Sequence, residues 1–117
     1  MTAPPAHDGI EVTTEHTAGA LAGGGAQVID VREDYEREAG HVAGTEHIAM
    51  ADLVSGAERI DRERPVIFVC RSGSRSLMAA QAFRRAGFEA YSMAGGLVRW
   101  AGEGRPLAPA RGHVADH

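Results

Sequence analysis

Four consecutive apolar residues, Val66-Ile67-Phe68-Val69, stand between Pro65 and Cys70 and constrain the fold more than any other feature of the chain. A run without polar alternation, rich in β-branched and aromatic residues, is typical of a strand that is covered on both faces. Such strands occur in parallel sheets flanked by helices. The run therefore predicts a central strand of an α/β domain.

The rest of the chain alternates short apolar runs with helical patterns, as expected for an α/β domain with a mainly parallel sheet. We expect strands at 10–12, 27–31, 47–48 and 89–93, helices at 14–21, 34–39, 50–60 and 76–86, and a short helix after Gly95-Gly96 that contains Trp100. Parallel sheets place ligands at the carboxyl ends of their strands. Cys70 directly follows one such end.

The 117 residues fit one domain, which we place at 9–103. Residues 1–8 read as a flexible tail. Residues 104–117 read as a second tail, because Pro106, Pro109 and Gly112 interrupt any pattern there. A chain of this length buries enough surface to fold without a metal or a disulfide, and its single cysteine excludes an internal disulfide.

Composition excludes several classes of function. The net charge is −4, all twelve basic residues are arginines without a cluster, and only 5% of the residues are aromatic, which argues against binding to nucleic acid. No apolar stretch approaches the roughly 18 residues that span a membrane, and the start of the chain lacks the pattern of a signal peptide. The six histidines show no metal-ligand spacing. We expect a cytoplasmic protein, which also suits a lone thiol.

The loop from Cys70 to Ser76 joins the buried strand to a helix. Its N–H groups and those of the first helical turn are expected to converge on a space that favours an anion. Gly73 gives the backbone freedom for a tight turn, and one of the serines is expected to cap the helix. The predicted anion-binding residues are Arg71, Ser72, Gly73, Ser74, Arg75 and Ser76.

Cys70 is the candidate nucleophile, because loop N–H groups, a helix terminus and two arginines favour the reactive thiolate. The guanidinium groups of Arg71 and Arg75 also match the geometry of an oxyanion substrate. Two plainer interpretations are a buried structural cysteine and a phosphate-binding loop without cysteine chemistry. The second is weak, since Gly73 is the only glycine of the loop and no lysine follows it.

Three separated segments resemble the rhodanese family, over about residues 10–100. They are Asp30-Val31-Arg32-Glu33 with Glu36 and Gly40-His41-Val42-Ala43-Gly44, the six-residue loop after Cys70, and Gly95-Gly96-Leu97-Val98-Arg99-Trp100. The resemblance implies a five-stranded parallel sheet with helices on both faces. It also implies a sulfurtransferase in which Cys70 takes sulfur from thiosulfate as a persulfide and passes it to cyanide or a thiol, without metal or organic cofactor.

The resemblance also implies roles for single residues. Asp30 and Arg32 would support the site, more as a partly buried pair that orders loops than as substrate contacts, and His41 would support the fold. The sequence departs from the family where Ala43, Ala49, His47 and Arg37 stand in place of two prolines, an asparagine and an aromatic residue; Tyr35 is a candidate to replace that ring. These changes lie in connecting segments.

Two other functions compete with sulfur transfer. Cysteine phosphatases and arsenate reductases use a cysteine, five residues and an arginine, whereas four residues separate Cys70 from Arg75 and Ser76 takes the arginine position. The shorter loop favours sulfur transfer. A regulatory binding module is disfavoured because the cysteine is present. A persulfide relay to a partner protein stays open, since the sequence does not identify the acceptor.

Overall fold

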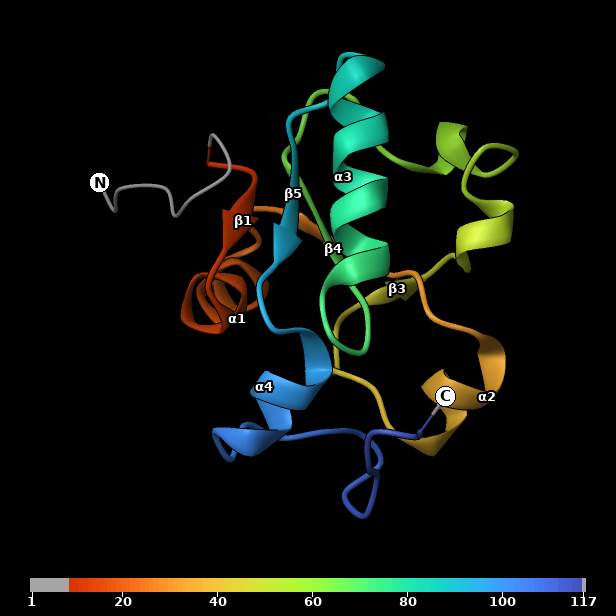
Figure 1. Ribbon diagram of the computed structural model, residues 1–117. Coiled ribbons are helices and arrows are strands. Elements are labelled where there is room, and N and C mark those ends of the chain that lie inside the picture. Colours follow the sequence, from red (N-terminus) through yellow and green to blue (C-terminus); the bar gives the residue numbers. More distant parts are fainter. Residues whose placement is uncertain (1–8, 117) are drawn as a thin grey trace.

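The apolar run at 66–69 forms strand β4 (Val66–Val69), which lies at the centre of a five-stranded sheet in the computed structural model. The structure describes residues 9–116. The order of the strands is β1-β5-β4-β2-β3, and every neighbouring pair is parallel. This confirms the predicted α/β fold with a parallel sheet (Figure 1).

The other strands are short, and each lies within one or two residues of a predicted one. The strands are β1 (Glu11–Val12), β2 (Gln27–Asp30), β3 (Glu46–His47) and β5 (Ala90–Met93). The α-helices are α1 (Thr14–Gly23), α2 (Asp34–Ala39), α3 (Ser74–Arg85) and α4 (Gly96–Gly102). Helix α3 begins two residues before the predicted start, so the loop after Cys70 is shorter than expected.

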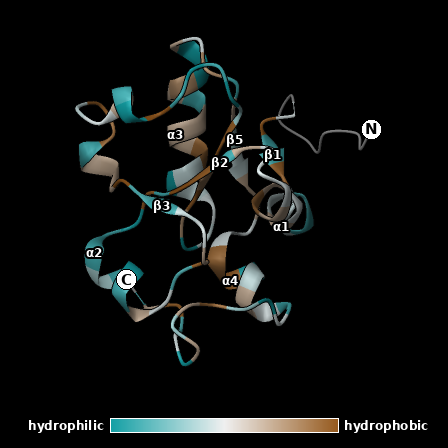
Figure 2. Ribbon diagram, turned by 180° about the vertical axis from the view of Figure 1, so that it is seen from behind, coloured by the Kyte–Doolittle hydropathy of each residue, from teal (hydrophilic) through white to brown (hydrophobic). Residues whose placement is uncertain are grey.

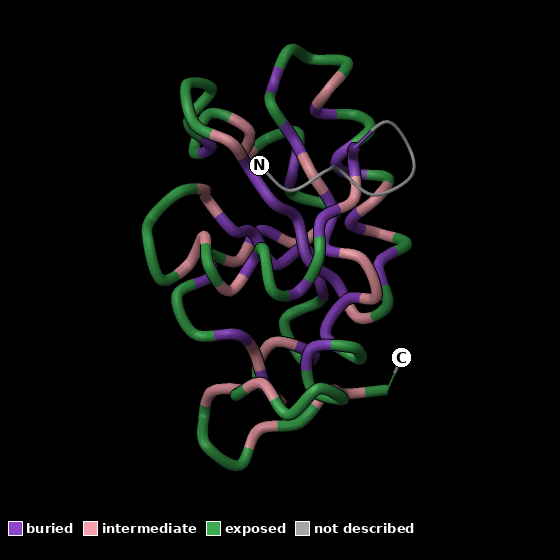
Figure 3. The backbone as a smooth tube through the Cα atoms, turned by 90° about the vertical axis from the view of Figure 1, so that its left-hand side faces the viewer, coloured by how far each residue is buried: buried purple, intermediate pink, exposed green. Residues whose placement is uncertain are grey.

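Helices cover both faces of the sheet. Alternate residues of β4 point to opposite faces, so each face of this strand is buried against a different set of helices. Val66 and Phe68 pack in one apolar cluster with α3 and the chain around Leu53 and Ile60. Ile67 and Val69 pack in a second cluster with residues of α1 and α4. Hydrophobic residues lie along the inner strands of the sheet, whereas the edge strand β3 is hydrophilic (Figure 2), and buried residues run through the middle of the molecule (Figure 3). The four-residue apolar run is thus explained by burial on two sides.

The helix predicted at 50–60 is wrong. The chain forms two single 3₁₀ turns there, η1 (Met50–Asp52) and η2 (Ala57–Arg59). Gly56 precedes the second turn and its N–H donates to the carbonyl of Asp52 at 2.8 Å, while the Ser55 hydroxyl donates to the same carbonyl. Serine and glycine are poor helix formers in mid-helix, and the Ser55 hydroxyl competes with the backbone for the Asp52 carbonyl.

Residues 104–116, which the sequence marks as a tail, lie against the domain. The indole N–H of Trp100 donates to the carbonyl of Pro106 at 2.9 Å, and His41 and Ala108 exchange two backbone hydrogen bonds. Leu107 and Val114 pack against the second apolar cluster. The chain thus runs from α4 back towards α2 (Figure 1). The predicted tail at 1–8 lies outside the described residues.

Between residues 9 and 116, no helix has the length and apolar character needed to cross a membrane.

Candidate active site

Cys70 lies at the carboxyl end of β4, between the sheet and the first turn of α3. Its sulfur accepts hydrogen bonds from the backbone N–H of Gly73 at 3.0 Å and of Ser76 at 3.4 Å. The residue is fully buried. Both donors point at the one atom that would carry negative charge in a thiolate, and such donors stabilise that charge.

The sulfur of Cys70 takes the place of a helix cap. The N-cap residue of α3 is Gly73, whose φ of 107° lies in the left-handed region, and no side chain accepts a hydrogen bond from the helix terminus at that position. The expected serine cap is therefore wrong, because a glycine stands where the capping side chain would be. Sγ instead accepts the N–H groups of the N-cap residue and of the third helical residue, which otherwise lack partners in a helix.

The three serines of the loop have different surroundings. Ser76 is fully buried, and its hydroxyl lies 3.4 Å from the Cys70 sulfur, 3.1 Å from the Gly73 carbonyl and 2.8 Å from the Ser92 hydroxyl. Ser72 and Ser74 are exposed. Only one of the predicted hydroxyl groups thus contacts the sulfur directly, and it joins the Cys70 sulfur to Ser92 of strand β5.

Gly95-Gly96 brings α4 against the Cys70 loop. The N–H groups of Leu97 and Val98 donate to the carbonyls of Cys70 and Arg71, both at 2.9 Å. Gly96 has a φ of 59°, and a Cβ there would come within 2.6 Å of the Cys70 carbonyl oxygen. The glycine is required by this close approach. The family resemblance located the motif, but its contact with the loop carbonyls emerges only from the fold.

Arg75 forms a two-point ion pair with Glu36 of α2. Its Nη1 and Nη2 atoms lie 2.7 Å and 2.9 Å from the two carboxylate oxygens. Glu36 is buried and Arg75 is half-buried. The hydrogen bond to Glu36 is the main cause that raises the pKa of Arg75 above its ordinary value, against the effect of burial, and the charge of Glu36 adds to it. The ion pair therefore holds the positive charge of Arg75 at the start of α3.

Arg71 contacts the chain that follows α4. Its Nε atom donates to the carbonyl of Ala115 at 3.0 Å, and its Nη2 atom lies 3.1 Å from a carboxylate oxygen of Asp116. Neither contact was predicted, because residues 104–117 were read as a tail. The two arginines of the loop are thus held by acidic groups from different parts of the chain.

Asp30 and Arg32 form a buried pair where β2 ends. Arg32 donates from Nε and Nη2 to the Asp30 carboxylate, at 3.0 Å and 2.8 Å, and also to the carbonyl of Gly40. Both side chains are about 1% exposed or less. One terminal nitrogen of the guanidinium, Nη1, is buried without a hydrogen-bond partner among the described residues. The pair connects the end of β2 to the turn after α2.

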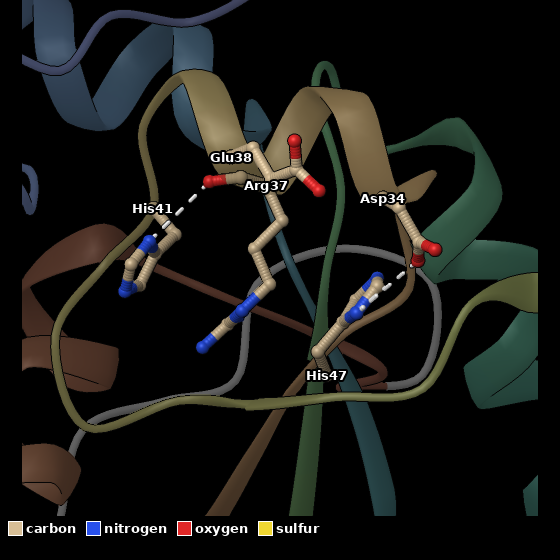
Figure 4. A pocket seen from close by; sticks show the side chains of 5 residues that line it. All are labelled: Asp34, Arg37, Glu38, His41 and His47. Atoms are coloured by element: carbon tan, nitrogen blue, oxygen red, sulfur yellow. Dashed lines mark hydrogen bonds and ion pairs between the residues drawn. The ribbon is translucent and has the colours of Figure 1, made fainter.

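A hollow of about 400 Å³ lies beside α2, lined by Asp34, Arg37, Glu38, His41 and His47. The Arg37 side chain extends between the two histidines (Figure 4). The His41 ring lies 3.3 Å from the carbonyl of Arg37 through Nδ1, which fits a supporting part in the fold. No residue of the Cys70 loop lines the hollow, so we do not assign it to the reaction. Across residues 9–116, no group of three or more potential ligands gathers into a metal site.

A cysteine held at a helix terminus on the carboxyl side of a five-stranded parallel sheet defines an α/β protein with a candidate nucleophile. The family model of the rhodanese-like domain matches residues 13–103. The chain therefore belongs to the rhodanese family.

Relatives and solved structures agree with this assignment. A protein of Bacillus subtilis named putative sulfurtransferase YtwF is 37% identical over 79 residues, covering 68% of this chain and 77% of the relative. The thiosulfate sulfurtransferase GlpE of Pseudomonas paraeruginosa is 36% identical over 77 residues, covering 65% and 70%. The crystal structure of a rhodanese-related protein from Thermoplasma volcanium has a TM-score of 0.77 at 23% identity, covering 84% of this chain and 96% of that one, which shows the shared fold.

Proposed function

We propose that this protein is a sulfurtransferase that moves sulfane sulfur through a persulfide on Cys70. The donor is thiosulfate or a persulfide, and the acceptor is cyanide or a thiol. The observation that carries the proposal is the pair of backbone N–H groups, from Gly73 and Ser76, that point at the Cys70 sulfur from the start of α3. The sulfurtransferase names of relatives that are more than one-third identical support it.

The reaction proceeds in two balanced steps. The Cys70 thiolate attacks the outer sulfur of thiosulfate, the sulfur–sulfur bond of the donor breaks, and its electron pair leaves with sulfite. The acceptor then attacks the outer sulfur of the persulfide and restores the thiolate. This is covalent catalysis of the ping-pong type. No external oxidant, metal or organic cofactor is needed to balance either step.

The loop from Arg71 to Ser76 is the proposed anion-binding cradle. Its N–H groups lie at a helix N-terminus, where negative charge is stabilised. Arg71 and Arg75 place positive charge at the loop, which offsets the repulsion between a thiolate and an anionic donor. Because Arg75 is also bound to Glu36, we assign it mainly to the electrostatic environment of the sulfur. Asp30 and Arg32 support the site from the end of β2.

The size of the loop argues against phosphoryl transfer. Ser76, which occupies the position of the arginine in cysteine phosphatases, is buried and bonded to Ser92. A serine hydroxyl carries no charge, so it cannot form the bidentate contact through which an arginine binds a phosphoryl group.

A low-molecular-weight thiol and a partner protein both remain proposed acceptors of the sulfur. An unpaired thiol that must cycle through a persulfide suits a reducing compartment, and we place the reaction in the cytoplasm.

The test is a steady-state assay in which thiosulfate and cyanide are both varied. We expect parallel double-reciprocal lines for the wild type, no turnover for Cys70→Ser and no hydrolysis of an aryl phosphate by either protein. Absence of turnover with thiosulfate and with persulfide donors would overturn the proposal. Hydrolysis of the aryl phosphate that depends on Cys70 would replace it with the phosphatase function.

A further inference from the structure

Arg71 is the loop cation whose partners lie outside the part of the chain matched by the family model. The match ends at residue 103, whereas Arg71 binds the Ala115 carbonyl and the Asp116 carboxylate, at 3.0 Å and 3.1 Å. Arg71 is 29% exposed and the Asp116 side chain is 95% exposed. The family's motifs therefore say nothing about this contact, which depends on how residues 104–116 are placed.

The segment 112–116 is held on the domain by several contacts before it reaches Arg71. The N–H of His113 donates to the carbonyl of Ala39 at 2.9 Å. Gly112 packs so closely on Gly40 that a Cβ at Gly112 would lie 2.9 Å from the Cα of Gly40. Val114 packs against the second apolar cluster. These contacts at the end of α2 fix the path of the chain just before Asp116.

A carboxylate at this place occupies the guanidinium that an anionic donor would use. Carboxylates and sulfur oxyanions bind the same N–H groups of an arginine. An anionic donor that binds Arg71, as proposed for the Cys70 loop, therefore displaces Asp116 or shares the guanidinium with it. An uncharged reagent meets no such competition.

We propose that Asp116 is a specificity-determining residue that acts through Arg71. It lowers the affinity of the site for anionic sulfur donors relative to uncharged ones, and leaves the chemical step on Cys70 unchanged. The proposal rests on the proposed function in two respects: Cys70 must be reactive, and Arg71 must belong to the anion-binding cradle. Because the pair is exposed, its effect is limited to about 2- to 5-fold and should shrink as salt is added.

The test compares two alkylating reagents that differ in charge, so it does not depend on sulfur transfer. Cys70 is alkylated with iodoacetate and with iodoacetamide, and the ratio of the two rates is measured. We expect Asp116→Asn to raise the ratio of iodoacetate to iodoacetamide by about 2- to 5-fold. Truncation after Val114 should do the same. The control is Glu63→Gln, which removes one exposed negative charge near the amino end of β4 and should leave the ratio unchanged.

A double variant assigns the effect to Arg71. Arg71→Gln should lower the ratio, and Asp116→Asn should then have no further effect. In the sulfur-transfer assay, Asp116→Asn should lower the KM for thiosulfate by the same factor and leave kcat unchanged. An unchanged ratio in Asp116→Asn, with wild-type Cys70 reactive and able to take up sulfur, would overturn this inference alone. If wild-type Cys70 reacts with neither reagent and takes up no sulfur, the proposed function falls and this inference falls with it.

Discussion

Glu36 and Arg75 lie thirty-nine residues apart in the sequence and form a two-point ion pair next to the Cys70 loop. Glu36 also accepts a hydrogen bond from the N–H of Glu33 at 2.9 Å, as part of the capping box at the start of α2. One buried carboxylate therefore joins the N-terminal turns of α2 and α3.

The two members of this pair should differ in what their loss costs. Arg75→Gln leaves a buried carboxylate without its main counter-ion, and removing one partner of a buried pair costs about 3–5 kcal/mol. Because Arg75 is 24% exposed, we expect the lower end of that range. Glu36→Gln leaves a guanidinium that can turn towards water, so a smaller loss of about 1–2 kcal/mol is expected.

Urea unfolding of the two variants and the wild type measures this difference. The prediction is contradicted if Glu36→Gln is the more destabilised of the two, or if Arg75→Gln unfolds at the same urea concentration as the wild type.

Ser76→Ala should weaken both the domain and the reaction. The change removes the hydroxyl between the Cys70 sulfur and Ser92 and leaves the buried Ser92 hydroxyl without that partner. A buried polar group that loses its partner costs about 1–3 kcal/mol, and persulfide formation should slow. Ser55→Ala, at an exposed position outside the Cys70 loop, is the matched control. Equal unfolding midpoints and equal rates of persulfide formation in the two variants would show that the Ser76 hydroxyl contributes neither to stability nor to the reaction.

Gly96→Ala should be among the most damaging glycine substitutions in the chain. The residue has a φ of 59°, and a Cβ there would meet the carbonyl groups of Cys70 and Arg71. A left-handed alanine costs about 1–2 kcal/mol, and overpacking adds about 1–3 kcal/mol. Gly19→Ala is the control, because a Cβ at that position in α1 has open space; it should stabilise the helix by about 0.4–1 kcal/mol. Thermal unfolding compares the two, and a Gly96→Ala variant as stable as the wild type would rule out the close approach of α4 to the loop.

The sequence predicts the centre of the fold well because burial leaves a strong pattern there. The run from Val66 to Val69 matches β4 at both ends, and the strand end that follows it places Cys70 beside a helix. The pattern around Leu53 and Ile60 is less informative. Both residues are buried as an amphipathic helix would require, but the chain reaches that burial through two 3₁₀ turns separated by Ser55-Gly56. Apolar spacing identified Leu53 and Ile60 as buried, but Val54 of the same pattern is 91% exposed, and the spacing did not predict the backbone conformation.

The sequence did not predict those contacts of the candidate site that join distant segments of the chain. The loop residues were found from their local pattern, but Glu36 could be matched to Arg75 only once α2 and α3 were placed in space. The contact between Arg71 and Asp116 has the same origin, since prolines and glycines at 104–117 gave no pattern that a packed segment would show. The serine expected to cap α3 was replaced by the Cys70 sulfur, because Gly73 stands at the capping position.

Persulfide formation on Cys70 is tested most directly by the intact mass of the protein after incubation with thiosulfate and removal of the excess reagent. We predict that the wild type gains the mass of one sulfur atom, that cyanide reverses the gain, and that Cys70→Ser gains nothing under the same conditions. A wild type that gains no sulfur from thiosulfate or from any persulfide donor, or a Cys70→Ser variant that gains as much as the wild type, would contradict the assignment of Cys70 as the sulfur carrier.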